Sequence, residues 1–231
     1  MPDIAAIREE LFHLLREKGA RLTGVADLTG VAGSAMPVGV SVAIPVPKGI
    51  VRDLQTAPTQ EYYEAYHAMN AQLNEIVSAG AEFLRAQGFR ARANTTLAVK
   101  QDSQWRTPLP HKTVATRAGL GWIGKSCLLV TSEFGSAVRL SSLLTDAPLP
   151  PDAPVDESRC GSCSVCVDRC PAHALTGRLW SPGVGREEIF RREDCKRAQI
   201  ERMKAATGME VDLCGLCFAV CPYTQEYLKR K

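Results

Sequence analysis

Cysteines are the residues of this chain that could carry chemistry, because eight of the nine fall into two spaced runs and one isolated position. The first run has the spacing CxxCxxCxxxC and is followed by Pro171. Bacterial ferredoxins use this spacing to hold 4Fe-4S clusters: three thiolates bind one cluster and the fourth serves the other. The run consists of Cys160, Cys163, Cys166 and Cys170. It therefore predicts a pair of clusters.

A second run ends in the same CxxxCP pattern but is one ligand short, because Val211 stands where its first cysteine would be. Cys195, midway between the two runs, is the nearby cysteine that can supply the missing thiolate. We therefore predict two ligand sets. One cluster takes Cys160, Cys163, Cys166 and Cys221, and the other takes Cys170, Cys195, Cys214 and Cys217.

Disulfides and zinc are the alternatives for these cysteines. Disulfides need an oxidising compartment, and the charged start MPDIAAIREELFHLLREKG lacks the apolar core of a secretory signal. Structural zinc sites use two CxxC pairs per metal and give no purpose to the two CxxxCP endings. We therefore favour clusters over both. Cys127, the remaining cysteine, is interpreted as a small buried apolar residue.

The charge balance gives little support to a nucleic-acid partner. The 28 basic and 25 acidic residues leave a net charge of +3, which is too weak an excess for that inference. Residues 178–204 contain eight basic and five acidic side chains, which we interpret as a solvated helix rather than a docking patch for an acidic partner or nucleic acid. No apolar run is long enough to cross a bilayer. We expect a soluble, cytoplasmic protein.

The segments around the cysteines predict an α+β protein of two domains. Helices are expected at residues 3–18 and 59–87, and a strand with one buried face at 38–46, ending or lying at a sheet edge because of Pro45 and Pro47. Further strands are expected near residues 92–100, 127–131 and 137–144. The proline-rich stretch 147–158 predicts the junction. The predicted domains are residues 1–148 and 149–231.

Residues 119–126, GLGWIGKS, match the P-loop pattern GxxxxGK[ST]. A P-loop needs a buried strand before it and a helix after it, so that backbone amides converge on the phosphates. Here a short helix is predicted before the motif and a strand after it. Trp122 and Ile123 also place bulk in a loop that must wrap closely around phosphate. We therefore do not interpret the motif as a nucleotide site.

Longer motifs carry a resemblance to a known family. The segment AGLGWIGKSCLLVTSEFGSAVRLSSLLTDAPL, followed by CGSCSVCVDRCPAHAL and LCGLCFAVCPY, resembles epoxyqueuosine reductases and their relatives, including reductive dehalogenases. The pair Tyr66-His67 looks like the Tyr-His pair of that family. The resemblance implies a nitroreductase-like domain that holds cobalamin and a two-cluster ferredoxin-like domain that supplies electrons. FMN is the alternative cofactor, because nitroreductase-like domains commonly bind a flavin.

The chain also departs from this family's pattern. Trp105 stands where epoxyqueuosine reductases have an aspartate proton donor, and Asp102 lies three residues earlier. The family's Glu-Arg pair corresponds to His111 and Lys112. The sequence ends at Lys231, shortly after Cys221, and shows no twin-arginine signal. We therefore expect neither reduction of tRNA-bound epoxyqueuosine nor respiratory dehalogenation, and no nucleic-acid partner.

Two functional hypotheses follow. In the first, the protein is a reductase: a ferredoxin or flavodoxin supplies electrons, which pass through the clusters to the organic cofactor and reduce a small substrate. Asp102 and His111 are then the candidate proton donors, and Lys112 could hold an anionic substrate or cofactor side chain. In the second, the protein is an electron carrier or reductive activator that has no substrate of its own and acts on a partner such as a corrinoid protein. The histidines His13, His67 and His173 are interpreted as structural.

Overall fold

The structure of the protein is a computed structural model that describes residues 3–230. Within this range the chain divides into two compact units. Unit 1 comprises the residues up to Ile44, Ala68–Leu120 and Arg139–Val155. Unit 2 comprises Pro45–His67, Gly121–Val138 and the residues from Asp156 onward. The last segment of unit 1 ends at Val155, inside the proline-rich stretch 147–158. The expected division into two domains at residue 148 stays a prediction.

Unit 1 is built on a four-stranded sheet whose strand order is β1-β2-β6-β3. Strands β1 and β2 are antiparallel with Val25 opposite Val40, and β3 and β6 are antiparallel with Arg92 opposite Leu144. The strands are β1 (Leu22–Asp27), β2 (Val38–Pro45), β3 (Ala91–Ala93) and β6 (Val138–Thr145). Strand β2 lies inside the sheet and six consecutive residues of it are buried. Both of its faces are therefore covered.

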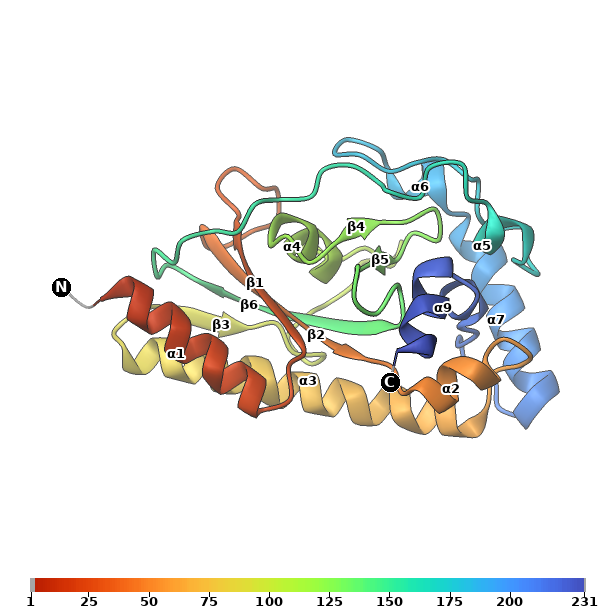
Figure 1. The fold of residues 1–231 in the computed structure, drawn as a ribbon, viewed down its shortest axis with the longest axis horizontal. Helices are drawn as coiled ribbons and strands as arrows, with labels where there is room; N and C mark the ends of the chain where they lie inside the picture. Colours follow the sequence, from red (N-terminus) through yellow and green to blue (C-terminus); the bar gives the residue numbers. More distant parts are fainter. Residues whose placement is uncertain (1–2, 231) are drawn as a thin grey trace. The chain divides into compact units, whose positions relative to one another are not determined.

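Helices cover both faces of this sheet, with α1 (Ile4–Glu17) and α3 (Gln60–Ala86) on one side and α4 (His111–Arg117) on the other (Figure 1). Asp3 caps α1 by accepting hydrogen bonds from the first-turn amides. Helix α3 packs closely because it has a glycine where it meets the sheet. A Cβ at Gly80 would lie 2.7 Å from Leu143 Cδ2 and 3.0 Å from Leu15 Cδ2. Residue 80 must therefore remain small.

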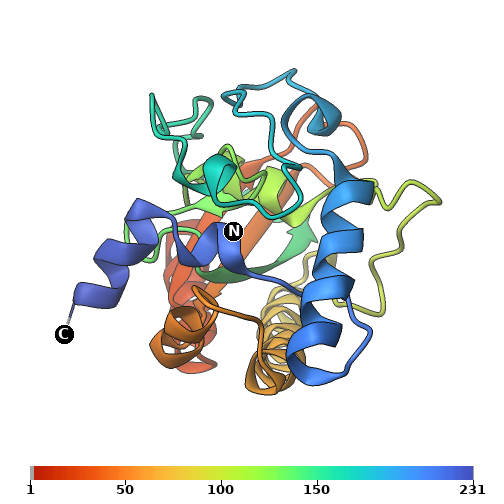
Figure 2. The same ribbon diagram turned by 90° about the vertical axis from the view of Figure 1, so that its right-hand side faces the viewer.

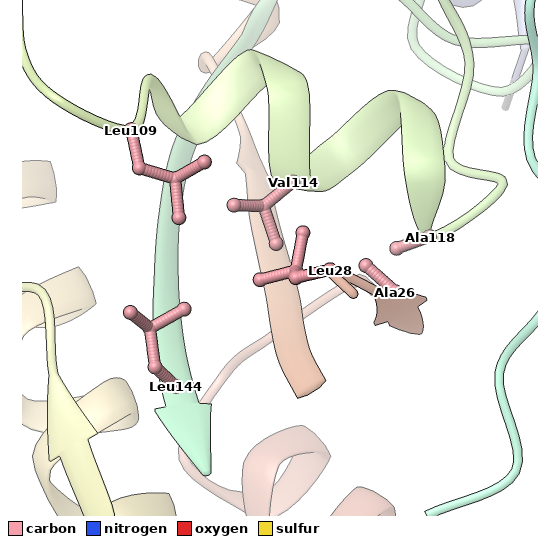
Figure 3. Close-up of a cluster of buried hydrophobic side chains, with 6 residues drawn as sticks. All are labelled: Ala26, Leu28, Leu109, Val114, Ala118 and Leu144. Atoms are coloured by element: carbon pink, nitrogen blue, oxygen red, sulfur yellow. The ribbon is translucent and has the colours of Figure 1, made fainter. Parts of the chain in front are cut away.

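The core between the sheet and α4 is a cluster of fully buried aliphatic side chains (Figure 3). Val114 projects from α4 toward Leu28, and Leu144 of β6 lies in the same cluster. Leu144 and Val114 are each 0% exposed. Burying an aliphatic side chain stabilises a fold by roughly 1.5–3 kcal/mol. This layer fixes the start of α4, where His111 is found.

Apart from α7, the elements of unit 2 are short and are connected by loops. Figure 2 shows α7 as the long blue helix on the right, below the loops that precede it. Strands β4 and β5 pair antiparallel, with Trp122 opposite Val130. The elements are α2 (Lys48–Asp53), β4 (Trp122–Ile123), β5 (Leu129–Val130), α5 (Val165–Asp168), α6 (Arg186–Ile189), α7 (Arg192–Thr207), α8 (Leu216–Ala219) and α9 (Pro222–Lys229). Helices α5 and α8, each carrying a cysteine of one run, contact each other.

The structure confirms the α+β class and the two long helices, and it corrects two expectations about strands. Strand β2 ends at Pro45 as expected, but it is an interior strand buried on both faces, not an edge strand with one buried face. Residues 92–100 form a strand only as far as Ala93. Beyond it, the amides of Ala98 and Val99 both bond back to the carbonyl of Thr95, which makes a turn. None of the helices in residues 3–230 is both long and apolar enough to span a membrane.

The aliphatic layer under α4 predicts a large stability effect from one truncation. Leu144→Ala should lower the free energy of unfolding by about 2–5 kcal/mol, because it removes buried methyl groups and leaves a cavity. The matched control is Leu97→Ala, whose side chain is 87% exposed and should change stability by less than about 0.5 kcal/mol. Denaturant titration monitored by circular dichroism measures both. Equal effects of the two substitutions would contradict the proposed core.

Candidate functional site

The structure brings the eight spaced cysteines into two neighbouring sets of four within unit 2. The thiol of Cys166 interacts electrostatically with those of Cys160, Cys163 and Cys221. The thiol of Cys217 interacts with those of Cys214, Cys195 and Cys170. Cys217 also interacts with Cys166, so the two sets are adjacent. These are the two groups that the sequence predicts, and α7 is the element that carries Cys195 into the second set.

The thiols in each set make it hard for their neighbours to ionise. Burial, and then the charges of its three neighbours, raise the pKa of Cys166 to about 12. Burial and the neighbouring thiols likewise raise the pKa of Cys217 well above its usual value. The pKa of Cys195 is raised mainly by burial, opposed by a hydrogen bond from Gln199. Ionisation of Cys166, Cys195 and Cys217 would therefore be favoured by a cationic group beside them.

The number and grouping of the thiols suit iron–sulfur clusters. None of the nine cysteines forms a disulfide. A tetrahedral zinc site needs Zn–S distances of about 2.3 Å, whereas a four-iron cube places one thiolate on each corner iron and holds the sulfurs further apart. The donor set thus fits two 4Fe-4S clusters.

The surroundings of the two sets also suit buried, charged clusters. Cys170, Ala174 and Leu175 form an apolar cluster against which Cys166, Cys195 and Cys217 pack. Gln199, one turn after Cys195 on α7, donates a hydrogen bond from Nε2 to Cys195 Sγ at 2.9 Å. Apolar burial and N–H bonds to sulfur are two of the factors that set a cluster's reduction potential.

The first thiol set is bordered by the segment GLGWIGKS, which the sequence left without a role. Lys125 is 8% exposed, and its Nζ donates hydrogen bonds to the carbonyls of Gly161 and Cys163, both at 2.9 Å. A Cβ at Gly124 would lie 3.4 Å from Cys160 Sγ, so the backbone runs close to this thiol. The sequence did not predict that Lys125 lies beside the first thiol set, because the only known pattern that GLGWIGKS matched was that of a phosphate-binding loop.

Trp122, from the same segment, adds a second donor next to the first thiol set. Its ring makes an edge contact with Tyr223, with centroids 4.9 Å apart, and the guanidinium of Arg159 lies 5.5 Å from its centroid. These two neighbours flank Cys221 and Cys160 in the chain. Trp122 Nε1 is buried and has no hydrogen-bond partner among the described residues. A sulfur of a cluster is one acceptor that could satisfy it.

The order of elements around GLGWIGKS is the reverse of that in a P-loop. Helix α4 ends before it, at Arg117, and the short strand β5 follows it. The helix and strand expected from the sequence are therefore both present. The backbone at Gly121 passes very close to that of β5, because a Cβ on Gly121 would lie 2.0 Å from the carbonyl oxygen of Val130. The segment contains strand β4 and leads into the turn before β5, so it does not open a helix.

His111 lies in a polar network inside unit 1. Its Nδ1 is 3.0 Å from the hydroxyl of Ser142, and Asn94 Nδ2 donates to the same hydroxyl at 3.2 Å. Burial, and then the charge of Arg139, lower the pKa of His111 to about 4. The imidazole is therefore neutral near pH 7. A neutral imidazole can accept a proton or share a hydrogen bond, but it is not a charged proton donor.

The other two predicted residues of this region differ in their setting. Asp102 is exposed, and its carboxylate accepts the backbone N–H groups of Gln104 and Arg106 at 2.8 and 2.9 Å. This bonding holds a turn in which Trp105 has a positive φ of 60° and is 42% exposed. Lys112 follows His111 at the start of α4 and is half-buried. Asp102 and His111 thus belong to different hydrogen-bond networks.

The remaining histidines and the ninth cysteine lie outside both thiol sets. His13 is exposed and lies 3.5 Å from Glu17 on α1. His67 is exposed and makes edge contacts with two tyrosine rings of α3. His173 has a positive φ of 46°, and its carbonyl accepts a hydrogen bond from Arg191. Cys127 is buried, 6% exposed, as the sequence predicts.

Comparison with known proteins supports the four-iron interpretation of unit 2. Residues 159–224 match a family described as a 4Fe-4S double cluster binding domain. This range contains both cysteine runs and Cys195. The predicted ferredoxin-like module is therefore confirmed at the level of the family.

Curated relatives confirm the resemblance to epoxyqueuosine reductases. The chain is 40% identical over 116 residues to the epoxyqueuosine reductase of Bacillus anthracis, a match that covers 49% of this chain and 29% of the relative. It is 39% identical over 137 residues to that of Synechococcus sp. (strain CC9605), covering 56% of this chain and 41% of the relative. The matched segments thus span less than half of these relatives.

Solved structures of low identity share the fold. A crystal structure of an epoxyqueuosine reductase with a modified tRNA stem loop matches 96% of this chain and 66% of that protein, with a TM-score of 0.63 and 20% identity. A catabolic reductive dehalogenase matches 96% of this chain and 33% of that protein, with a TM-score of 0.73 and 18% identity. At these identities the likeness shows the fold alone.

The buried setting of His111 predicts a pH-dependent stability. Its pKa is about 4 in the folded protein, against an ordinary value of 6.5. As the pH falls, His111 is therefore protonated in the unfolded chain before it is protonated in the folded protein. Stability should therefore be complete above pH 6.5 and fall as the pH drops toward 4, by on the order of 2 kcal/mol. Thermal unfolding of wild type and His111→Asn between pH 7 and 4.5 tests this, and the variant should lose less stability.

His13→Asn is the control for that measurement, because His13 is exposed with a side-chain exposure of 69%. It should follow the wild-type pH profile. If His111→Asn also follows that profile, the structural environment assigned to His111 is incorrect.

Proposed function

We propose that this protein is an iron–sulfur oxidoreductase in which two 4Fe-4S clusters deliver electrons for the reduction of a small substrate. The observation that carries the proposal is the collection of eight thiols into two adjacent sets of four. Cys160, Cys163, Cys166 and Cys221 hold one cluster, and Cys170, Cys195, Cys214 and Cys217 hold the other. Because Cys217 interacts with both sets, electrons need to cross only a short distance between them.

The chain's own residues prepare this site in three ways. Pro171 and Pro222 follow the last cysteine of each run, and Pro222 begins helix α9 directly after Cys221. Helix α7 supplies Cys195 from outside both runs. Apolar residues around Cys170 exclude water from the second set. Exclusion of water keeps the clusters away from hydrolysis and strengthens the effect of nearby charges and hydrogen bonds.

We further propose that unit 1 binds the organic cofactor, with cobalamin favoured over FMN because a reductive dehalogenase of similar fold is described as B12-dependent. A corrinoid supplies a redox-active cobalt that can accept single electrons. The network of Asn94, Ser142 and His111 provides buried hydrogen-bonding groups suited to the amide side chains that a corrinoid carries. Lys112, at the start of α4, is the candidate contact for an anionic side chain or phosphate.

Asp102 and His111 remain the candidates for moving a proton to the substrate, but their settings give them different capacities. The Asp102 carboxylate is exposed, and it accepts hydrogen bonds from two backbone amides. His111 is neutral near pH 7 because its pKa is about 4. It is therefore suited to accepting a proton or sharing a hydrogen bond.

A carrier without its own substrate is the second candidate function, and the same observations favour it. The carboxylate of Asp102 holds a turn, and the imidazole of His111 is uncharged near neutral pH. A protein that only passes electrons to a corrinoid or flavin partner needs neither donor. Its electron donor would be of the ferredoxin or flavodoxin type, and it would act in the cytoplasm.

The ligand assignment predicts different outcomes for two cysteine substitutions. Cys195→Ser should lose one cluster, so that the iron content of anaerobically purified protein falls from about eight to about four per chain. Cys127→Ala, the matched control, should keep the wild-type iron content, because Cys127 lies outside both sets. Iron analysis with absorption spectroscopy measures both. Full iron in Cys195→Ser would refute the proposed ligand sets.

Cofactor retention and turnover distinguish enzyme from carrier. A reductase should retain stoichiometric corrinoid through anaerobic gel filtration and oxidise reduced methyl viologen in the presence of a substrate. A brominated hydroxybenzoate and an epoxyqueuosine-modified tRNA stem loop, the ligands of two structural relatives, are the first substrates to test. Asp102→Asn should then lower turnover by about 10²–10⁴-fold, while Lys100→Gln, two residues away, should not. Iron without organic cofactor or turnover would favour the carrier.

A further inference from the structure

Lys125 is a buried cation whose described partners carry no charge. Its side chain is 8% exposed, and its hydrogen bonds go to main-chain carbonyls, those of Gly161 and Cys163 at 2.9 Å. Among the described residues it forms no salt bridge, whereas Lys204 and Lys229 are each paired with a glutamate. A buried ammonium is costly when no anion compensates it. The structure therefore calls for an anion close to Lys125.

The two carbonyls that bind Lys125 belong to the loop between the first thiols of the first set. Gly161 follows Cys160, and Cys163 is itself in the set. The preceding residue, Gly124, places its backbone against Cys160, since a Cβ there would lie 3.4 Å from Sγ. Lys125 thus approaches the first set from the segment 121–126, which belongs to the same unit. At the second set Gln199 donates a hydrogen bond to Cys195, and the charge of Arg192 also acts on this thiol.

A 4Fe-4S cluster with four thiolates is an anionic group, and it gains one further negative charge when it accepts an electron. A nearby cation stabilises the more negative, reduced state more than the oxidised state. The effect is larger when the cation is buried, because water and salt screen it less. Net charge and hydrogen bonding near the sulfurs are known determinants of cluster potential.

We propose that Lys125 is the counter-charge of the cluster held by Cys160, Cys163, Cys166 and Cys221, and that it raises the reduction potential of this cluster alone. This inference rests on the proposed function, because it assumes that both clusters are present. Lys125 is a positioning residue: it holds the loop through two carbonyls and supplies a positive charge that the neutral carbonyls cannot cancel. The motif GLGWIGKS then serves the metal site instead of a phosphate.

Four variants test the proposal in anaerobic protein. Lys125→Gln removes the charge but keeps an N–H donor for the carbonyls, and Lys125→Arg keeps the charge. Lys229→Met is the matched control, because Lys229 is in the same unit with a side-chain exposure of 70%. Gln199→Leu removes the hydrogen bond to Cys195 and should affect the other cluster. Each protein is analysed for iron and then titrated electrochemically while the two clusters are followed by electron paramagnetic resonance.

The proposal predicts that Lys125→Gln retains about eight irons and that one of its two midpoint potentials falls. The expected fall is at least a tenfold change in the reduction equilibrium, about 59 mV for one electron. Lys125→Arg should restore the wild-type value, Lys229→Met should leave both potentials unchanged, and Gln199→Leu should lower the potential that Lys125→Gln spares. Iron lost from Lys125→Gln but kept by Lys125→Arg would also support a role for the charge.

Other outcomes would overturn the proposal. Unchanged potentials in Lys125→Gln with full iron would show that the charge does not act on the cluster. Equal defects in Lys125→Gln and Lys125→Arg would assign the residue a purely steric role. Wild-type protein with far fewer than eight irons would instead refute the proposed function, so the two failures are distinguishable.

Discussion

The constraint on which the rest of unit 2 depends is the cost of ionising thiols that lie close together and are partly removed from water. Burial and three neighbours already raise the pKa of Cys166 to about 12, and the pKa of Cys217 is shifted in the same direction. Both thiols would ionise more readily with cationic iron beside them. We therefore expect the loops of unit 2 that carry the cysteines to depend on the proposed clusters. Metal binding and the folding of this unit are expected to be coupled.

Unit 1 differs from unit 2 because it contains a buried polar network within a layered aliphatic core. Aliphatic side chains such as Val114 and Leu144 fix α4 against the sheet, and this places His111 beside Ser142. Burial then keeps the imidazole uncharged near pH 7, because it lowers the pKa of His111 to about 4. The packing of the sheet thus determines the chemical capacity of a side chain that the sequence alone presents as an ordinary histidine.

The features that sequence predicts well are those that are local in the chain. The close spacing of the cysteines indicates the cluster runs, the deficit at Val211 indicates a distant ligand, and apolar periodicity predicts α1 and α3. The features that it misses depend on contacts between distant segments. Lys125 reaches Gly161 across 36 residues, and β2 is buried on both faces because helices from elsewhere cover it. No pattern within either segment records these partners.

The central claim is that two four-iron clusters occupy unit 2, and native mass spectrometry of the anaerobically purified wild-type chain tests it most directly. The account predicts a dominant species whose added mass corresponds to about eight iron and about eight sulfide ions. A dominant species carrying zinc, a single cluster, or intramolecular disulfides without metal would contradict it.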